Sequence, residues 1–229
     1  GDVLLAAVNY SSNCLGTIND IKTITEKVKS KGGLVYIDAV QYVPHGITDV
    51  QKLGCDFLVC SAYKFFGPHQ GILWGRAELL QRLEPYKVRP APEKIPGCFE
   101  TGTQSHEGMA GTIAAVDYFS WLGESMASDY HQKYDNFNGR RLFVHAAMDC
   151  LFNYEKTLAR RLIDGLDSLP RIRLHGVTAA DATHRRVPTV LFELKGACPD
   201  VIAEKLGTQN ICVVWPHVCC RGSAIPGHL

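Results

Sequence analysis

Short apolar runs alternate with helical patterns in the first part of the chain. Val3–Val8 is a continuous apolar run that opens into polar residues, as a buried parallel strand does. A helix is expected to begin after Asn19 and Asp20, which can cap it, and Leu34–Ile37 is a second buried strand. This order predicts a β-α-β unit.

Two further apolar runs continue the alternation. Phe57–Cys60 predicts a third strand and Ile72–Trp74 a fourth. Strands that alternate with helices indicate an α/β layer fold with a mainly parallel sheet, and such sheets bind ligands beyond the carboxyl ends of their strands. Asn13, Asp38 and Lys64 each follow or end one of these predicted strands.

The remainder of the chain has a different pattern. Residues 84–100 are rich in proline and predict a loop, and a helix is predicted over Met109–Leu122. An amphipathic helix follows at Tyr154–Leu169, with Pro170 as its stop. The predicted elements after this helix are two strands, a helix and a final strand, at Ile172–Leu174, Val187–Leu194, Asp200–Leu206 and Ile211–Trp215.

This order predicts two domains. We expect a large α/β domain over residues 1–123, a linker with a connecting helix over 124–150, and a partial α+β domain over 151–229. The chain does not begin with Met and opens directly on a strand pattern, so we expect it to be a fragment of a longer protein.

Composition narrows the classes of partner. The 24 Lys and Arg residues nearly balance the 23 Asp and Glu residues, which argues against a nucleic acid or an anionic membrane surface as the ligand. No apolar run approaches the ~20 residues that span a bilayer. The nine cysteines include no C-x-x-C spacing, so no metal site is expected, and a cytoplasmic or other reduced intracellular compartment fits them best.

Lys64 and Asp38 are the candidate chemical groups. A lysine beside Phe65 and Phe66 is expected to lose charge by desolvation, which makes an amine a nucleophile. Each residue also has an ordinary interpretation, because lysines often extend along apolar surface into water and aspartates often cap turns. Neither Lys64 nor Asp38 by itself distinguishes a catalytic role from these ordinary roles.

Three segments together make the sequence recognisable. They are Tyr36–Gln41 (YIDAVQ), Cys55–Pro68 (CDFLVCSAYKFFGP) and Phe99–Thr103 (FETGT). In this order they resemble the cysteine-desulfurase-like branch of the class V aminotransferase superfamily. The resemblance implies a fold-type I enzyme that depends on pyridoxal 5'-phosphate (PLP).

The resemblance also implies roles for matching residues around the cofactor ring. Lys64 matches the lysine that forms the imine with PLP, and Asp38 matches the carboxylate that keeps the pyridine nitrogen protonated. Gln41 and Asn13 match residues that hydrogen-bond the ring hydroxyl side. The implied catalytic pair is therefore Lys64 with Asp38.

The phosphate side of the cofactor has three matching residues. Ser61 matches a phosphate-binding serine, and Tyr63 stands where many relatives carry histidine. Thr103 matches a residue that reaches the phosphate of the neighbouring subunit, which implies a homodimer. Without the resemblance, ordinary turn or cap bonding is the preferred explanation of Ser61 and Thr103.

The substrate implied is an amino acid, but the reaction stays open between a cysteine desulfurase or selenocysteine lyase and a class V aminotransferase. Cys219 falls near the place of the desulfurase nucleophile, two residues after His217, yet Val214 stands where an arginine is expected. The family also supplies upstream groups that precede Gly1. The alternative is a catalytically incomplete fragment that keeps the fold and the dimer surface.

Overall fold

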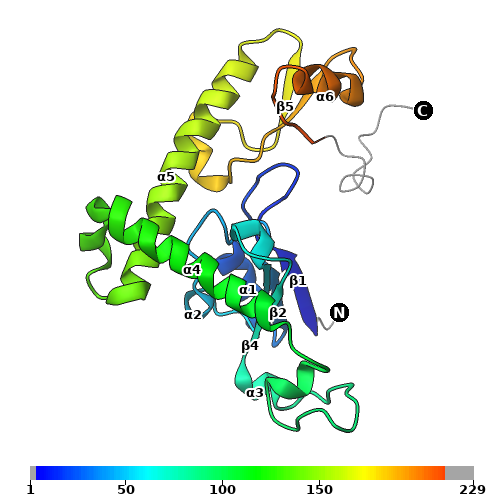
Figure 1. Ribbon diagram of the computed structural model, residues 1–229. Coiled ribbons are helices and arrows are strands. Elements are labelled where there is room, and N and C mark those ends of the chain that lie inside the picture. Colours follow the sequence, from blue (N-terminus) through cyan, green and yellow to red (C-terminus); the bar gives the residue numbers. More distant parts are fainter. Residues whose placement is uncertain (1–3, 215–229) are drawn as a thin grey trace. The chain divides into compact units, whose positions relative to one another are not determined.

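The structure is a computed structural model that describes residues 4–214 (Figure 1). It divides into two compact units, which we describe separately. Of the described residues, 4–11 and 18–154 form what we call the sheet unit, and 12–17 and 155–214 form the C-terminal unit. Helix α5 (Gly139–Asp167) contributes residues to both.

The sheet unit contains a four-stranded sheet in the order β1-β2-β3-β4. Its strands are β1 (Leu5–Asn9), β2 (Leu34–Asp38), β3 (Phe57–Ser61) and β4 (Gly71–Gly75). The first three strands are parallel and β4 pairs antiparallel with β3. The four strands predicted from apolar runs are confirmed, with ends that differ by at most two residues.

Helices and short 3₁₀ turns connect and cover these strands. They are α1 (Ile21–Lys29), α2 (Val50–Leu53), η1 (Ala62–Phe65), α3 (Ala77–Leu80), η2 (Gly97–Phe99), α4 (His106–Met126) and η3 (Ser128–Tyr134). Local signals fix several ends: Asp20 caps α1 by accepting a hydrogen bond from the Thr23 amide at 3.1 Å, and Gly54 ends α2 in the left-handed conformation.

Helix α5 begins fifteen residues before the amphipathic pattern that predicts it at Tyr154. The early turns carry Ala146, Ala147 and Met148, all three buried. Apolar residues surround this stretch of the helix on more than one side, so no single stripe marks it in the sequence. Packing in the sheet unit therefore decides where α5 begins.

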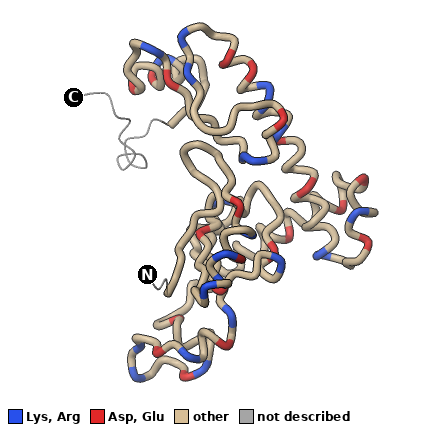
Figure 2. The backbone as a smooth tube through the Cα atoms, turned by 180° about the vertical axis from the view of Figure 1, so that it is seen from behind, with Lys and Arg blue, Asp and Glu red and all other residues tan. Residues whose placement is uncertain are grey.

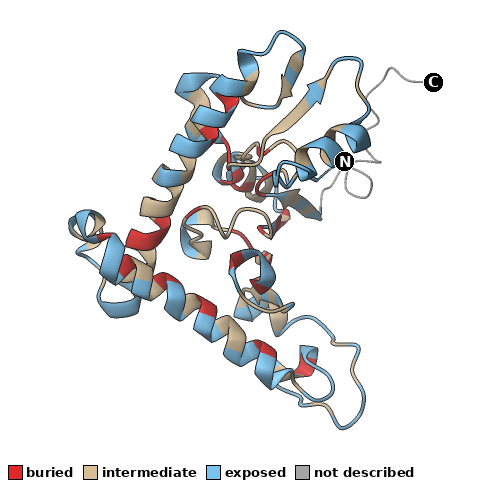
Figure 3. Ribbon diagram, turned by 45° about the horizontal axis from the view of Figure 1, so that its top comes forward, coloured by how far each residue is buried: buried red, intermediate tan, exposed pale blue. Residues whose placement is uncertain are grey.

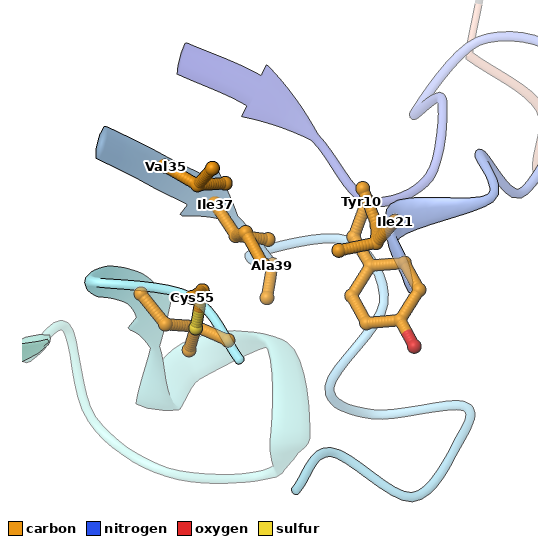
Figure 4. Packing of buried hydrophobic residues seen from close by; sticks show 7 residues of the cluster. Tyr10, Ile21, Val35, Ile37, Ala39 and Cys55 are labelled. Atoms are coloured by element: carbon orange, nitrogen blue, oxygen red, sulfur yellow. The ribbon is translucent and has the colours of Figure 1, made fainter. Parts of the chain in front are cut away.

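Two apolar clusters hold the sheet unit together. The first lies against β2, where Val35 and Ile37 point to one face of the sheet and are fully buried (Figure 4). Its other buried members are Tyr10, Ile21, Ala39, Cys55 and Leu58. Burying each large aliphatic side chain here contributes about 1.5–3 kcal/mol.

The second apolar cluster joins β3 and η1 to the long helices. Cys60, Ala62 and Phe65 pack there with Ala115 and Phe119 of α4 and with Met148 of α5. Buried positions recur along α4 between exposed ones (Figure 3). Because Ala62 and Phe65 flank Tyr63 and Lys64 in η1, this cluster fixes the turn that carries Lys64.

A buried carboxylate connects three elements of the sheet unit. Asp56 is 2% exposed and lies 2.7 Å from the Lys29 ammonium and 3.4 Å from the Arg76 guanidinium. It also accepts a hydrogen bond from the Val35 amide at 2.8 Å. Burial of this charge is tolerated because both cations and a backbone donor compensate for the lost water.

The C-terminal unit has the α+β composition that the sequence predicts. Strands β5 (Ile172–His175) and β6 (Leu191–Leu194) form an antiparallel pair. They accompany the second half of α5, the 3₁₀ turn η4 (Ala180–Arg185) and α6 (Pro199–Gly207). The domain boundaries expected from the sequence, after residue 123 and after residue 150, remain a prediction.

The strand predicted at Ile211–Trp215 is wrong for the part of it that lies within the described residues. Residues 211–214 are not in a strand, and the Ile211 amide bonds to the Leu206 carbonyl at 3.0 Å, so this segment closes α6. Trp215 lies outside the described residues. An apolar run forms a strand only where a neighbouring strand can accept its hydrogen bonds.

Charge is distributed evenly along the chain. Lys and Arg alternate with Asp and Glu along both units, without a long run of either sign (Figure 2). None of the helices within residues 4–214 has the length and apolar character needed to cross a membrane.

Candidate active site

The carboxyl ends of the parallel strands bring three candidate residues to one edge of the sheet. Asp38 ends β2 and is in register with Asn9 of β1 and Val59 of β3. Ser61 ends β3, and Lys64 follows in η1. A carboxylate, a hydroxyl and an amine therefore gather where α/β sheets commonly bind ligands.

The backbone of Asp38 is fixed on both sides by the sheet. Its carbonyl accepts a hydrogen bond from the Tyr10 amide at 2.7 Å, and the next amide, of Ala39, donates to the Val59 carbonyl at 2.9 Å. The side chain is exposed and its Oδ1 caps a turn by accepting the Val40 amide at 3.0 Å. Within the described residues Oδ2 accepts no hydrogen bond, so the turn cap leaves one carboxylate oxygen for a ligand.

The turn that carries Lys64 is held by its apolar neighbours. Phe65 is 6% exposed, whereas Tyr63 and Lys64 are exposed. Phe66 adopts the left-handed conformation (φ 66°), and its ring lies 5.6 Å from that of Tyr118 in α4. A non-glycine residue there is strained, and such strain persists only where packing enforces it, which often happens at functional sites.

The apolar surroundings expected for Lys64 do not form within the described residues. Phe65 is used by the core and Phe66 packs on α4, so neither covers the ammonium. The Lys64 Nζ instead lies 5.5 Å from the centroid of the Tyr63 ring, a cation–π distance. The expectation of a desolvated lysine was therefore wrong for this chain by itself.

His69 lies beside a candidate site residue, Tyr63, and the sequence did not suggest this contact. It lies between β3 and β4 and stacks on Tyr63, with ring centroids 5.0 Å apart and an angle of 13° between the planes. The only signal for His69 was its place in the connection after the Lys64 motif.

The remaining candidates lie on other segments. Gln41 is half-buried in the turn after Asp38, and Thr103 is exposed two residues before Ser105, the N-cap of α4. Asn13 is exposed in residues 12–17, which belong to the C-terminal unit. The sheet edge thus assembles Asp38, Gln41, Ser61 and Lys64 with Tyr63, whereas Thr103 and Asn13 come from separate loops.

A pair of tyrosines supports this edge and was also missed. The rings of Tyr10 and Tyr42 stack at 3.6 Å, and their hydroxyl groups share a hydrogen bond. Tyr10 is also the residue whose amide binds the Asp38 carbonyl. Burial raises the pKa of both hydroxyls, and the proximity of Tyr42 raises the pKa of Tyr10 further.

The raised pKa of Tyr10 predicts a loss of stability in alkali. The neutral hydroxyl is favoured in the folded protein, so its contribution is complete below the unfolded pKa of about 10 and is lost as pH rises above it, by about 1.4 kcal/mol per pH unit. Tyr10→Phe should flatten this decline in urea unfolding measured at several alkaline pH values. Tyr86→Phe, at a fully exposed tyrosine, is the control. Equal slopes for the two variants would contradict the prediction.

The donor set can be tested against a cofactor. PLP offers a ring nitrogen, a ring hydroxyl, an aldehyde and a phosphate, and the edge supplies a free carboxylate oxygen, an exposed amine and a hydroxyl. The carboxylate can pair with the ring nitrogen of PLP, the amine can react with its aldehyde, and the hydroxyl can bind its phosphate. The side chains at this edge therefore fit the cofactor. Among the residues that the structure describes, no group of three or more His, Cys, Asp or Glu side chains is placed to hold a metal ion.

Known proteins resemble this chain over much of its length. The cysteine desulfurase of Serratia proteamaculans (strain 568) is 32% identical over 185 residues, which cover 75% of this chain and 40% of the relative. The cysteine desulfurase of Yersinia pseudotuberculosis serotype O:1b is 40% identical over 141 residues, or 56% of this chain and 35% of the relative. The chain therefore spans less than half the length of these relatives.

Solved structures show the same fold. A cysteine desulfurase from Thermococcus onnurineus NA1 matches with a TM-score of 0.72 and 25% identity, covering 91% of this chain and 48% of that one. The cysteine desulfurase CsdA from Escherichia coli matches with a TM-score of 0.68 at 23% identity, over 91% and 48% of the two chains, a likeness of fold. The expected α/β fold of fold-type I transferases, with a partial C-terminal α+β domain, is confirmed.

A family model described as aminotransferase class-V matches residues 2–143. These residues include the whole four-stranded sheet, the Asp38 turn and the Lys64 turn. The chain belongs to the aminotransferase class-V family.

Proposed function

We propose that this chain is the cofactor-binding part of a PLP-dependent enzyme that acts on an amino acid. The observation that carries the proposal is the placement of Asp38 and Lys64 at one sheet edge, with Oδ2 of Asp38 unbonded among the described residues. Membership of the aminotransferase class-V family and the likeness to cysteine desulfurases support it.

Asp38 and Lys64 have distinct tasks in this proposal. When bound, PLP draws electrons from the substrate's α-carbon and so weakens the bonds to that carbon. Asp38 would accept a hydrogen bond from the protonated pyridine nitrogen, and its negative charge would favour that protonated state. Lys64 would hold the cofactor through its ε-amino group and would move a proton at the substrate's α-carbon.

The neutral polar residues orient the cofactor. Ser61 and Tyr63 donate hydroxyl hydrogen bonds to the phosphate, a dianion for which charge-assisted bonds are strong. Gln41 and Asn13 bind the ring hydroxyl side through their amides. Thr103 reaches the phosphate of a second subunit, so we propose a homodimer as the working form.

The choice of reaction depends on residues near the end of the chain. Val214 is exposed, while Cys219 and His217 lie outside the described residues. We propose either sulfur or selenium elimination, as in a cysteine desulfurase or selenocysteine lyase, or transamination. We also propose a cytoplasmic or other reduced intracellular compartment, on the cysteine spacing given above.

Borohydride reduction tests the attachment at Lys64. The chain is incubated with PLP, reduced and digested, and the modified peptide is located by mass spectrometry. We expect the label on Lys64, no label at that peptide in Lys64→Ala, and an unchanged label in Lys52→Ala, which removes another exposed lysine. A wild-type chain without label at Lys64 would favour the alternative of a catalytically incomplete fragment.

A second assay distinguishes the reactions. If the label appears on Lys64, PLP-loaded protein that has not been reduced is given cysteine, and sulfide release is compared with keto-acid formation. Sulfide that disappears in Cys219→Ser would support a desulfurase with Cys219 as its nucleophile. Keto acid that persists in this variant would support an aminotransferase.

A further inference from the structure

The segment that carries Asn13 is built into the C-terminal unit, although it directly follows β1 in the sequence. Residues 12–17 cluster with residues from 155 onward. Thr17 forms an isolated antiparallel bridge with Arg186. The conformation of the Asn13 turn is therefore coupled to the strand-like segment around Arg186.

Arg186 is the centre of this attachment. It is 2% exposed, the largest fully buried side chain in the described residues. Its Nη2 donates to the Thr189 carbonyl at 2.5 Å and reaches the Leu15 carbonyl at 3.5 Å, and its Nε donates to the Val187 carbonyl at 3.3 Å. A further bond, from Nη1, goes to the Val177 carbonyl.

Gly16 allows the two segments to approach closely. Its carbonyl accepts the Val187 amide at 2.8 Å, and a Cβ at this residue would lie 2.4 Å from the Thr189 carbonyl oxygen and 3.3 Å from Nη2 of Arg186. Gly16 also adopts φ +73°, which favours glycine. The Arg186 guanidinium and Gly16 therefore lie in one tightly packed contact between residues 12–17 and the segment around Arg186, which we call the seam.

The guanidinium is compensated by carbonyl dipoles and not by an acid. Among the described residues no carboxylate bonds to Arg186, and burial, with a smaller effect of the positive Arg160, lowers the pKa of Arg186. Arg160 itself pairs with Asp164 and donates to the Thr178 carbonyl at 2.7 Å. Because a buried cation needs every one of its acceptors, it fixes the backbone of the three segments that supply the four carbonyls.

We infer that Arg186 is a positioning residue that holds the Asn13 turn for the cofactor. In this view the packing of residues 12–17 on the segment around Arg186 determines the conformation in which the Asn13 amide is presented. The inference rests on the proposed function, in which Asn13 binds the ring hydroxyl side of PLP.

The test compares Arg186→Met with Arg185→Met, which removes the exposed neighbouring arginine. Hydrogen exchange, measured without cofactor, should rise at the Gly16 and Val187 amides in Arg186→Met and stay unchanged in the control. PLP affinity, titrated by visible absorbance, should fall about 10-fold in Arg186→Met, the effect of losing one hydrogen bond. Exchange that is equal in the two variants would overturn the inference.

A double-mutant cycle separates positioning from general loosening. If Arg186 acts through Asn13, Arg186→Met should weaken PLP binding in the wild-type background but not in Asn13→Ala. Fully additive losses would overturn the inference. If Arg186→Met does not fold, Gly16→Ala disrupts the same seam from the other side and should show the same non-additivity.

The two proposals fail differently. A wild-type chain that does not bind PLP overturns the cofactor part of this inference together with the proposed function. The exchange comparison needs no cofactor, so it still decides whether Arg186 holds residues 12–17. A chain that binds PLP at Lys64, with additive losses in the cycle, refutes only the positioning role.

Discussion

Replacement of Asp38 by asparagine is expected to lower turnover about 100-fold to 1,000-fold, the usual effect of removing a preorganised electrostatic partner. The reason is charge. Asparagine keeps the oxygen that accepts the Val40 amide, so the turn should survive, but it cannot favour a protonated pyridine nitrogen. The measurement is turnover of the PLP-loaded protein, with the reaction identified by the product assay.

Controls separate charge from turn capping. Asp38→Ala removes the turn cap as well, so it should lose stability in addition to activity. Asp49→Asn changes another aspartate that caps a turn of backbone, through the Gln51 and Lys52 amides, and should leave turnover unchanged. Wild-type turnover in Asp38→Asn would contradict the assigned role.

Gly123→Ala is expected to destabilise the sheet unit severely, by more than about 4 kcal/mol. A Cβ on Gly123 of α4 would lie 1.8 Å from the backbone carbonyl oxygen of Phe143 in α5. A backbone atom cannot rotate aside, so the two helices would have to separate and open the apolar cluster between them. Urea unfolding followed by circular dichroism measures the loss.

A second helical glycine is the matched control. Gly165 in α5 has nothing within 4 Å of its Cβ position, so Gly165→Ala should stabilise the protein by about 0.5–1 kcal/mol through helix propensity. The opposite signs of the two changes are the distinctive result. Equal stability of Gly123→Ala and the wild type would show that α4 and α5 do not pack this closely.

Local patterns were sufficient for the sheet and for part of the site. The apolar runs gave β1 to β4 because buried parallel strands have few polar residues, and Asp20 marked the start of α1 because a cap bonds within its own turn. The placement of Asp38 and Lys64 beyond strand ends followed from the same order of elements.

The interactions that join distant segments were not predictable from local patterns. His69 stacks on Tyr63 and Tyr42 stacks on Tyr10 because of how turns fold back, and nothing in the spacing of these residues indicates a contact. Lys64 proved to be exposed because Phe65 is buried in the core and Phe66 is itself 75% exposed, with its ring beside Tyr118 of α4.

The sequence by itself determined the order of the strands along the chain, the family motifs and the side chains that are candidates for the cofactor site. Each of these depends on residues that are neighbours along the chain. Only the tertiary structure decided that the Asn13 turn belongs to the C-terminal unit, that α5 begins at Gly139, and that residues 211–214 close a helix. The physical reason is that each of these outcomes depends on which distant backbone groups and apolar surfaces meet, and the free energy of such contacts outweighs local preference.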